Sequence, residues 1–214
     1  MNYSVIIPYL LEGTVTAIKL FAMTLLFAVP LGLLVARLRA VKSPLVSVPI
    51  RFYLLLMRGT PLLLQLIFFM YFPPFVLDIS IDRFIAALIA FSLNYAAYFA
   101  EIFRGGIDSI PQGQSEAAKV LGFSSWQTFR KIILPQVIKR VIPASANECM
   151  TLVKDTALAQ TIGVFELFRA AQNTTSREVS IIPIFIAGAF YLIMNSVVAA
   201  IFNRAEKKLS YYKG

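Results

Sequence analysis

Long apolar stretches alternate with short polar links along this chain of 214 residues. A helix needs about 20 mostly apolar residues to cross the hydrocarbon core of a bilayer. The pattern predicts five such spans, at approximately residues 14–36, 46–72, 84–103, 141–165 and 181–202. The second span is interrupted at Arg58-Gly59-Thr60-Pro61. We therefore expect an all-α integral membrane protein with one transmembrane domain over residues 1–214.

The first residues form a separate short apolar segment, Asn2 to Leu11. It is too short to cross a bilayer, so we expect it to lie along the membrane interface. Because it carries Glu12 beside it and no Lys or Arg, it does not have the pattern of a signal peptide.

Composition agrees with a membrane protein. Hydrophobic residues make up 58% of the chain and charged residues 14%, whereas a soluble domain is about half apolar and about a quarter charged. The chain has no His and a single Cys, Cys149, which excludes an internal disulfide and argues against a Cys/His metal cluster. The net charge of +9 lies mostly in the links between apolar spans, so membrane topology explains it better than nucleic-acid binding.

The basic residues also predict the orientation. They gather in alternate links and in the tail: Arg37, Arg39, Lys42 and Arg51; Arg104, Lys119, Arg130, Lys131, Lys139 and Arg140; Arg204, Lys207, Lys208 and Lys213. Basic links mark the cytoplasmic side. The amino terminus is therefore expected outside, and the carboxyl terminus and the central loop of about residues 105–140 are expected in the cytoplasm.

The central loop has the pattern of two short helices. Pro111 suits a helix start, residues 115–121 favour a helix, and Gly122 suits a left-handed helix end. Ser124 and Gln127 match a capping box for a second helix. That helix would carry an apolar stripe, formed by Trp126, Phe129, Ile132 and Ile133, before Pro135 bends or stops it. From these features alone, an ordinary interfacial hairpin and a docking element are about equally supported.

The spacing within this loop resembles a known motif. Glu116-Ala117-Ala118, three residues, Gly122, nine residues, Ile132, one residue and Leu134-Pro135 is similar to the EAA loop in the membrane subunits of ABC importers. Further matches resemble the polar amino acid permeases of the histidine and glutamine type: Arg58-Gly59-Thr60-Pro61, Ala97-Tyr98 with Glu101, Arg104-Gly105 and Lys154-Asp155-Thr156. The resemblance covers about residues 14–205, with Ala157 where that family often has Ser.

The resemblance implies a type I importer subunit in a prokaryotic inner membrane. Two permeases, two copies or two paralogues, would form the pathway, and each loop would dock into a cytoplasmic ATPase. Glu116 would be the charged contact, Gly122 the turn and Phe123 to Trp126 the inserted tip, with Ala117, Ala118, Leu134 and Pro135 completing the motif. ATP and Mg would bind the ATPase, because this chain has no Gly-x-x-x-x-Gly-Lys-Ser/Thr run and needs no cofactor of its own. A solute-binding protein would deliver the amino acid from outside. The chain itself would not be an enzyme.

Charged residues in the fourth span are the candidates for substrate contact. Glu148, Thr151 and Asp155 share roughly one helix face, and Asn147, Thr151 and Lys154 form the adjoining stripe. Intramembrane charges usually face a cavity and usually have a function. We expect Glu148 to offer a counter-charge to a cationic amino acid, and Arg58 is a candidate partner of Asp155. Structural ion pairs between helices explain Arg58, Lys154 and Asp155 equally well.

Two other classes of membrane protein use buried charges. A secondary transporter usually contains two inverted repeats, and no repeat is visible in this sequence. A channel needs a pore-lining filter segment, and none stands out. The importer is therefore the favoured hypothesis, with a gradient-driven transporter or a channel-like protein as the alternative.

Overall fold

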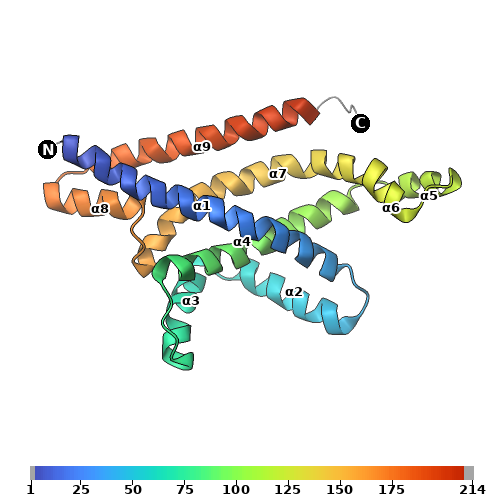
Figure 1. The fold of residues 1–214 in the computed structure, drawn as a ribbon, viewed down its shortest axis with the longest axis horizontal. Coiled ribbons are helices and arrows are strands. Elements are labelled where there is room, and N and C mark those ends of the chain that lie inside the picture. The colour runs from blue at the N-terminus through green and yellow to red at the C-terminus, as the bar shows by residue number, and fades with distance from the viewer. Residues whose placement is uncertain (1–2, 210–214) are drawn as a thin grey trace.

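The computed structural model describes residues 3–209, and these fold into helices joined by short links (Figure 1). The elements are α1 (Tyr3–Arg39), α2 (Pro44–Gly59), α3 (Leu62–Leu77), α4 (Arg83–Asp108), α5 (Gln112–Val120), α6 (Ser125–Thr128), η1 (Phe129–Ile133), α7 (Leu134–Asp155), η2 (Thr156–Ile162), α8 (Leu167–Glu178) and α9 (Ile182–Leu209). Figure 1 shows α8 and the start of α1 at one end of the molecule, and α5 with α6 at the opposite end.

The first helix is longer than the sequence pattern predicts. The segment from Tyr3 to Leu11 is the beginning of α1, so the expectation of a separate interfacial segment is wrong. Ile6 and Leu10 are fully buried against α8. Gly13 permits this packing, since a Cβ there would lie 2.8 Å from the Glu166 backbone. This contact is between remote parts of the chain, so periodicity near the amino terminus did not reveal it.

The predicted second span is broken. Helices α2 and α3 are bent by 110° at the predicted Arg58-Gly59-Thr60-Pro61 interruption. In Figure 1, α3 projects away from the long bundle. The bend frees backbone carbonyls, and two buried amides satisfy them: Gln65 donates to the Met57 and Thr60 carbonyls at 3.0 and 3.2 Å. Asn94 of α4 donates to the Met57 carbonyl at 2.8 Å and to Gln65 Oε1 at 2.9 Å. Polar groups within a membrane need such partners.

Helix α4 is the centre of the bundle and packs against α1, α3 and α7. Its buried face is rich in small residues: Ala86, Ala87, Ala90, Ala96, Ala97 and Ala100. Small residues let helices approach closely where lipid removes the hydrophobic drive for association. At Gly32, α1 and α4 are so close that an added Cβ would lie 2.8 Å from Phe99 Cβ. The large contact between α1 and α4 therefore forms the rigid frame of the subunit.

The predicted fourth span divides into α7 and the tight 3₁₀ turns of η2. Gly163 then ends η2 with a φ of 83°, a left-handed conformation that glycine adopts without a steric penalty. After this turn the chain enters α8, which the sequence pattern did not indicate.

Length and composition support fewer complete spans than predicted. Within residues 3–209, α1, α4 and α9 are each long and apolar enough to cross a membrane, and α2 with α3 counts as one broken span. Helix α7 carries too many charges to meet the same criterion, among them Glu148, Lys154 and Asp155. The count of five spans is therefore approximate, while the all-helical membrane fold is confirmed.

Candidate functional site

The predicted coupling loop is a helix–turn–helix. Helix α5 ends at Val120, and Gly122 follows with a φ of 78°, the left-handed conformation that its glycine identity predicts. The capping box is present: the Ser124 N–H donates to Gln127 Oε1 at 2.9 Å, and the Gln127 N–H donates to Ser124 Oγ at 3.2 Å. Both bonds join residues only three positions apart.

The loop is anchored to the body by polar and apolar contacts. Gln114 of α5 and Gln136 of α7 exchange reciprocal side-chain bonds at 3.0 and 2.5 Å. Arg140 also donates to the Ser109 carbonyl, joining α7 to the end of α4. Ala118, from the Glu-Ala-Ala segment, is buried at 1% exposure. A small side chain is therefore needed at Ala118 for packing.

The opposite side of the loop is exposed. Glu116 and Ala117 are exposed on α5, and Val120 is 88% and Trp126 66% exposed at the tip. Phe123 is half-buried, and its N–H bonds the Ala118 carbonyl at 3.0 Å. The tip therefore presents a carboxylate beside apolar and aromatic surface, a combination suited to a protein partner.

The helix after the tip does not stop at Pro135. Residues Phe129–Ile133 form a wider π-helical turn, in which the Leu134 N–H bonds the Phe129 carbonyl. Pro135 then stands at the start of α7, where its missing N–H costs little. The expectation that Pro135 stops the second helix is therefore wrong, because the path from the tip into α7 is continuous. Leu134 and Pro135 lie on that path.

The charged residues of the fourth span fall at the carboxyl-terminal half of α7. Asp155 Oδ2 accepts a hydrogen bond from the Tyr95 hydroxyl at 2.8 Å, linking α7 to α4. Glu148 is half-buried and lies within electrostatic range of Asp155, Tyr95 and Arg58. Lys154 lies within electrostatic range of Asp155. The predicted adjoining stripe, Asn147, Thr151 and Lys154, is exposed on this subunit.

Arg58 has a different partner from the expected one. Its guanidinium lies 3.7 Å from Glu101 and 5.5 Å from the centre of the Tyr98 ring, a cation–π distance. Asp155 takes a neutral hydroxyl instead, so the predicted Arg58–Asp155 pair is wrong. Both partners of Arg58 belong to α4, a contact between remote parts of the chain that sequence spacing could not reveal.

Glu101 is the centre of a second charged cluster. It forms ion pairs with Arg39 of α1, Arg58 of α2 and Arg104 of α4, the last at 3.0 Å. Arg104 also pairs with Asp108 at 2.5 Å. The cluster joins the carboxyl-terminal parts of these three helices. The resemblance includes Glu101, but the residue chemistry alone did not assign it a role.

A further carboxylate, Glu166, was not among the predicted site residues. It is fully buried and begins α8, accepting from the Phe168 and Arg169 N–H groups at 2.7 Å and from the Tyr191 hydroxyl at 2.9 Å. Burial raises the pKa of the Glu166 carboxyl, while these donors oppose the rise. One sequence feature could have indicated this cap: Glu166 directly precedes a polar stretch that favours a helix. With all its donors local to α8 and α9, Glu166 is a structural cap.

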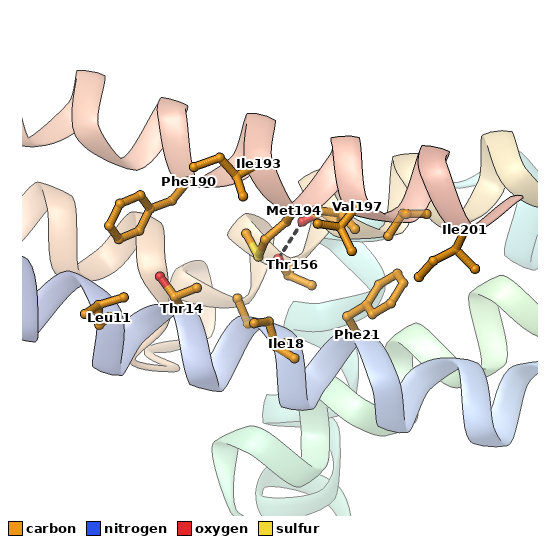
Figure 2. Close-up of a pocket in the computed structure, with 13 residues that line it drawn as sticks. Leu11, Thr14, Ile18, Phe21, Thr156, Phe190, Ile193, Met194, Val197 and Ile201 are labelled. Atoms are coloured by element: carbon orange, nitrogen blue, oxygen red, sulfur yellow. Dashed lines mark hydrogen bonds between the residues drawn. The ribbon is translucent and has the colours of Figure 1, made fainter. Parts of the chain in front are cut away.

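An apolar cavity of about 460 Å³ lies between α1 and α9 (Figure 2). Its only polar side chains are Thr14 and Thr156. Thr14 donates to the Leu10 carbonyl of α1 at 2.8 Å, and Thr156 of η2 donates to the Val153 carbonyl of α7 at 2.7 Å. Figure 2 shows apolar side chains such as Ile18, Phe21 and Val197 facing this space. A cavity without a free polar group does not suit an amino acid, so the substrate candidates remain those around Glu148. Within residues 3–209, no cluster of acidic, Cys or His side chains could hold a metal ion.

Comparisons with known proteins agree with the architecture. The chain is 35% identical over 205 residues to the arginine transport system permease protein of Bacillus subtilis, covering 95% of this chain and 93% of that protein. It is 33% identical over 204 residues to the putative glutamine transport system permease protein of Rickettsia felis, covering 95% and 94%. The crystal structure of an amino acid ABC transporter with histidines matches with a TM-score of 0.87 at 29% identity, over 97% of this chain and 99% of that one.

The family model for the binding-protein-dependent transport system inner membrane component matches residues 28–211. This match includes the broken α2–α3 span, the helix–turn–helix loop and the charged part of α7. The match argues against the alternative hypotheses of a gradient-driven transporter and of a channel. The family's members are transport subunits without catalytic activity. The chain belongs to this family of multi-pass inner-membrane components of ABC importers.

Proposed function

We propose that this chain is the permease subunit of an ATP-driven importer for a cationic amino acid. Its amino terminus lies outside and its carboxyl terminus in the cytoplasm, in agreement with the basic links. It works with a second permease, a copy or a paralogue, with cytoplasmic ATP-binding subunits that hold ATP and Mg, and with an extracytoplasmic solute-binding protein.

The substrate assignment rests on the partial burial of Glu148 and on its lack of an ion-pair partner among the described residues. It is half-buried in α7 and forms no ion pair with another residue of the described range 3–209. The nearest positive group on α2, Arg58, is engaged by Glu101 and the Tyr98 ring. Asp155, in electrostatic range, adds a second negative charge. Ionised groups inside a membrane need a partner, and a cationic substrate supplies one.

The exposed stripe of α7 supports a pathway beside Glu148. Asn147 and Thr151 would face lipid if the subunit worked alone, although their polar groups gain from water or from another polar surface. A second permease against this face would enclose a polar passage containing Asn147, Thr151 and Glu148. Amino acid substrates would then pass between the two subunits.

The coupling role rests on the exposed tip. Glu116, Val120 and Trp126 are held out from the body by a turn that the Ser124–Gln127 box stabilises. The continuous helix from this tip into α7 connects the loop to the Glu148 region through one element. Movement of a docked ATPase would therefore displace the substrate site directly.

The relatives' names include both an arginine and a glutamine system. The test therefore compares a positively charged substrate with a neutral one. Glu148→Gln is compared with wild type in the reconstituted transporter, using arginine and glutamine as substrates. Loss of a charge-assisted contact costs about 1.5–3 kcal/mol, so arginine uptake is expected to fall about tenfold or more while any glutamine uptake stays within about twofold. Glu12→Gln is the control, because Glu12 is an exposed carboxylate in the amino-terminal part of α1. Unchanged arginine uptake by an intact Glu148→Gln complex would contradict the proposal.

A further inference from the structure

A cavity of about 370 Å³ lies between the end of α1, α2 and α4. Its charged lining consists of Arg39, Arg51, Arg58 and Glu101, and its remaining lining is Leu54, Leu55 and Gly59. Three guanidinium groups face one carboxylate, so positive charge is in excess. This cavity is separate from the apolar space between α1 and α9.

The described chain offsets only part of this charge, through Glu101 and through Asp108, which pairs with Arg104 and lies within electrostatic range of Arg39. Glu101 is already shared among Arg39, Arg58 and Arg104. Arg51 forms no ion pair with any residue of the described range, and Arg39 lies within electrostatic range of Arg51, Arg58 and Arg104. Guanidinium groups this close to one another repel, and an anion between them would relieve that repulsion. Guanidinium forks match phosphate oxygens in geometry.

The surface beside the cavity is apolar and exposed. Leu45, Val48, Phe52 and Leu55 follow one another at three- and four-residue spacing and are all exposed along α2. Such spacing places them on one helix face. Leu55 belongs both to this stripe and to the cavity lining. A ligand that uses both features has an anionic head and long apolar chains.

We propose that this cavity binds the phosphate of an anionic phospholipid in the cytoplasmic leaflet, with the acyl chains along the exposed stripe of α2. The leaflet follows from the orientation proposed above, while the site itself depends only on the cavity and the stripe. Arg51 is the residue most available to the headgroup, and Arg39 and Arg58 flank it. The lipid would neutralise the cluster that joins α1, α2 and α4.

The test measures phospholipid retained by the purified, complete transporter, using native mass spectrometry and phosphorus quantification. Wild type is expected to retain phosphatidylglycerol in preference to phosphatidylcholine. A basic residue near an anionic membrane surface contributes about fivefold in affinity, so Arg51→Gln should lower phosphatidylglycerol retention by about that factor. Arg51→Lys should retain most of the binding because it keeps the charge.

Arg37→Gln is the matched control, since Arg37 is exposed at the same end of α1 and does not line the cavity. Equal retention of the two lipids, or equal loss in Arg37→Gln and Arg51→Gln, would overturn the proposal. Displacement of the bound lipid by inorganic phosphate alone, or binding of inorganic phosphate in lipid-free detergent, would assign the site to free phosphate instead. Because the readout is lipid binding, it is independent of the uptake assay for Glu148.

Discussion

The predicted coupling loop and the charged part of α7 are built in opposite ways. The loop is fixed by bonds between near neighbours, such as Ser124 with Gln127, and leaves its tip exposed. The α7 charges are placed by distant contacts, since Tyr95 and Asp155 are 60 residues apart. The loop can therefore keep its shape while it moves with a partner. The charge cluster can keep its geometry only while α4 and α7 stay packed.

The largest effect is expected from reversing the charge at the exposed tip. Glu116→Arg removes the carboxylate that we propose contacts the ATPase. Lost interface hot spots cost about 2 kcal/mol or more, about thirtyfold in affinity. ATP-dependent uptake should fall by a similar factor, while the thermal unfolding of the permease stays unchanged because Glu116 is exposed.

Glu12→Arg provides the control for that charge reversal, because Glu12 is exposed near the opposite end of the molecule. If both variants lose uptake equally, the effect belongs to net charge and the docking role of Glu116 is wrong.

A smaller effect is expected inside the bundle. Tyr95→Phe removes the hydroxyl that donates to Asp155 and leaves a half-buried carboxylate without that donor. Such a loss costs about 1–3 kcal/mol, so the permease should unfold at a lower temperature and the KM for arginine should change. The measurement is thermal unfolding in detergent together with uptake kinetics.

Tyr98→Phe is the matched control on the same helix, because it keeps the ring that lies beneath Arg58 and removes only a hydroxyl. The comparison between loop and bundle would lose its basis if Tyr95→Phe were as stable and active as Tyr98→Phe.

The smallest effect concerns the turn itself. Gly122→Ala forces a Cβ onto a residue with a φ of 78°, at a cost of about 1–2 kcal/mol, although nothing lies within 4 Å of that Cβ. The strain should shift the tip and lower the affinity for the ATPase by about fivefold to thirtyfold at most, as measured by co-purification at graded concentrations. Gly113→Ala, also without a neighbour within 4 Å but with an ordinary helical conformation, should have no such effect.

These two regions also show what the sequence can predict. Gly122, Ser124 and Gln127 act through neighbours a few residues away, so their identities were sufficient to predict the turn and its cap. Arg58 has its partners in α4, a remote part of the chain whose position no local pattern specifies. The prediction of Arg58 with Asp155 failed for that reason.

The end of the molecule that holds α8 and the start of α1 is a further example. The burial of Ile6 and Leu10 depends on α8, and α8 in turn begins at the buried Glu166. Hydrophobic periodicity identified the spans because lipid imposes it on each helix separately. It did not identify polar contacts between helices, among them Gln65 with Asn94, because each partner looks like an isolated polar residue in its own span.

We propose that the loop transmits force from ATP hydrolysis and that Glu148 recognises the substrate. The most direct test measures arginine uptake and binding-protein-stimulated ATP hydrolysis in the same vesicles for Glu148→Gln and Glu116→Arg. We expect Glu148→Gln to lower arginine uptake and retain ATP hydrolysis, and Glu116→Arg to lower both together. Retained uptake in Glu148→Gln, or normal coupled hydrolysis in Glu116→Arg, would contradict the claim.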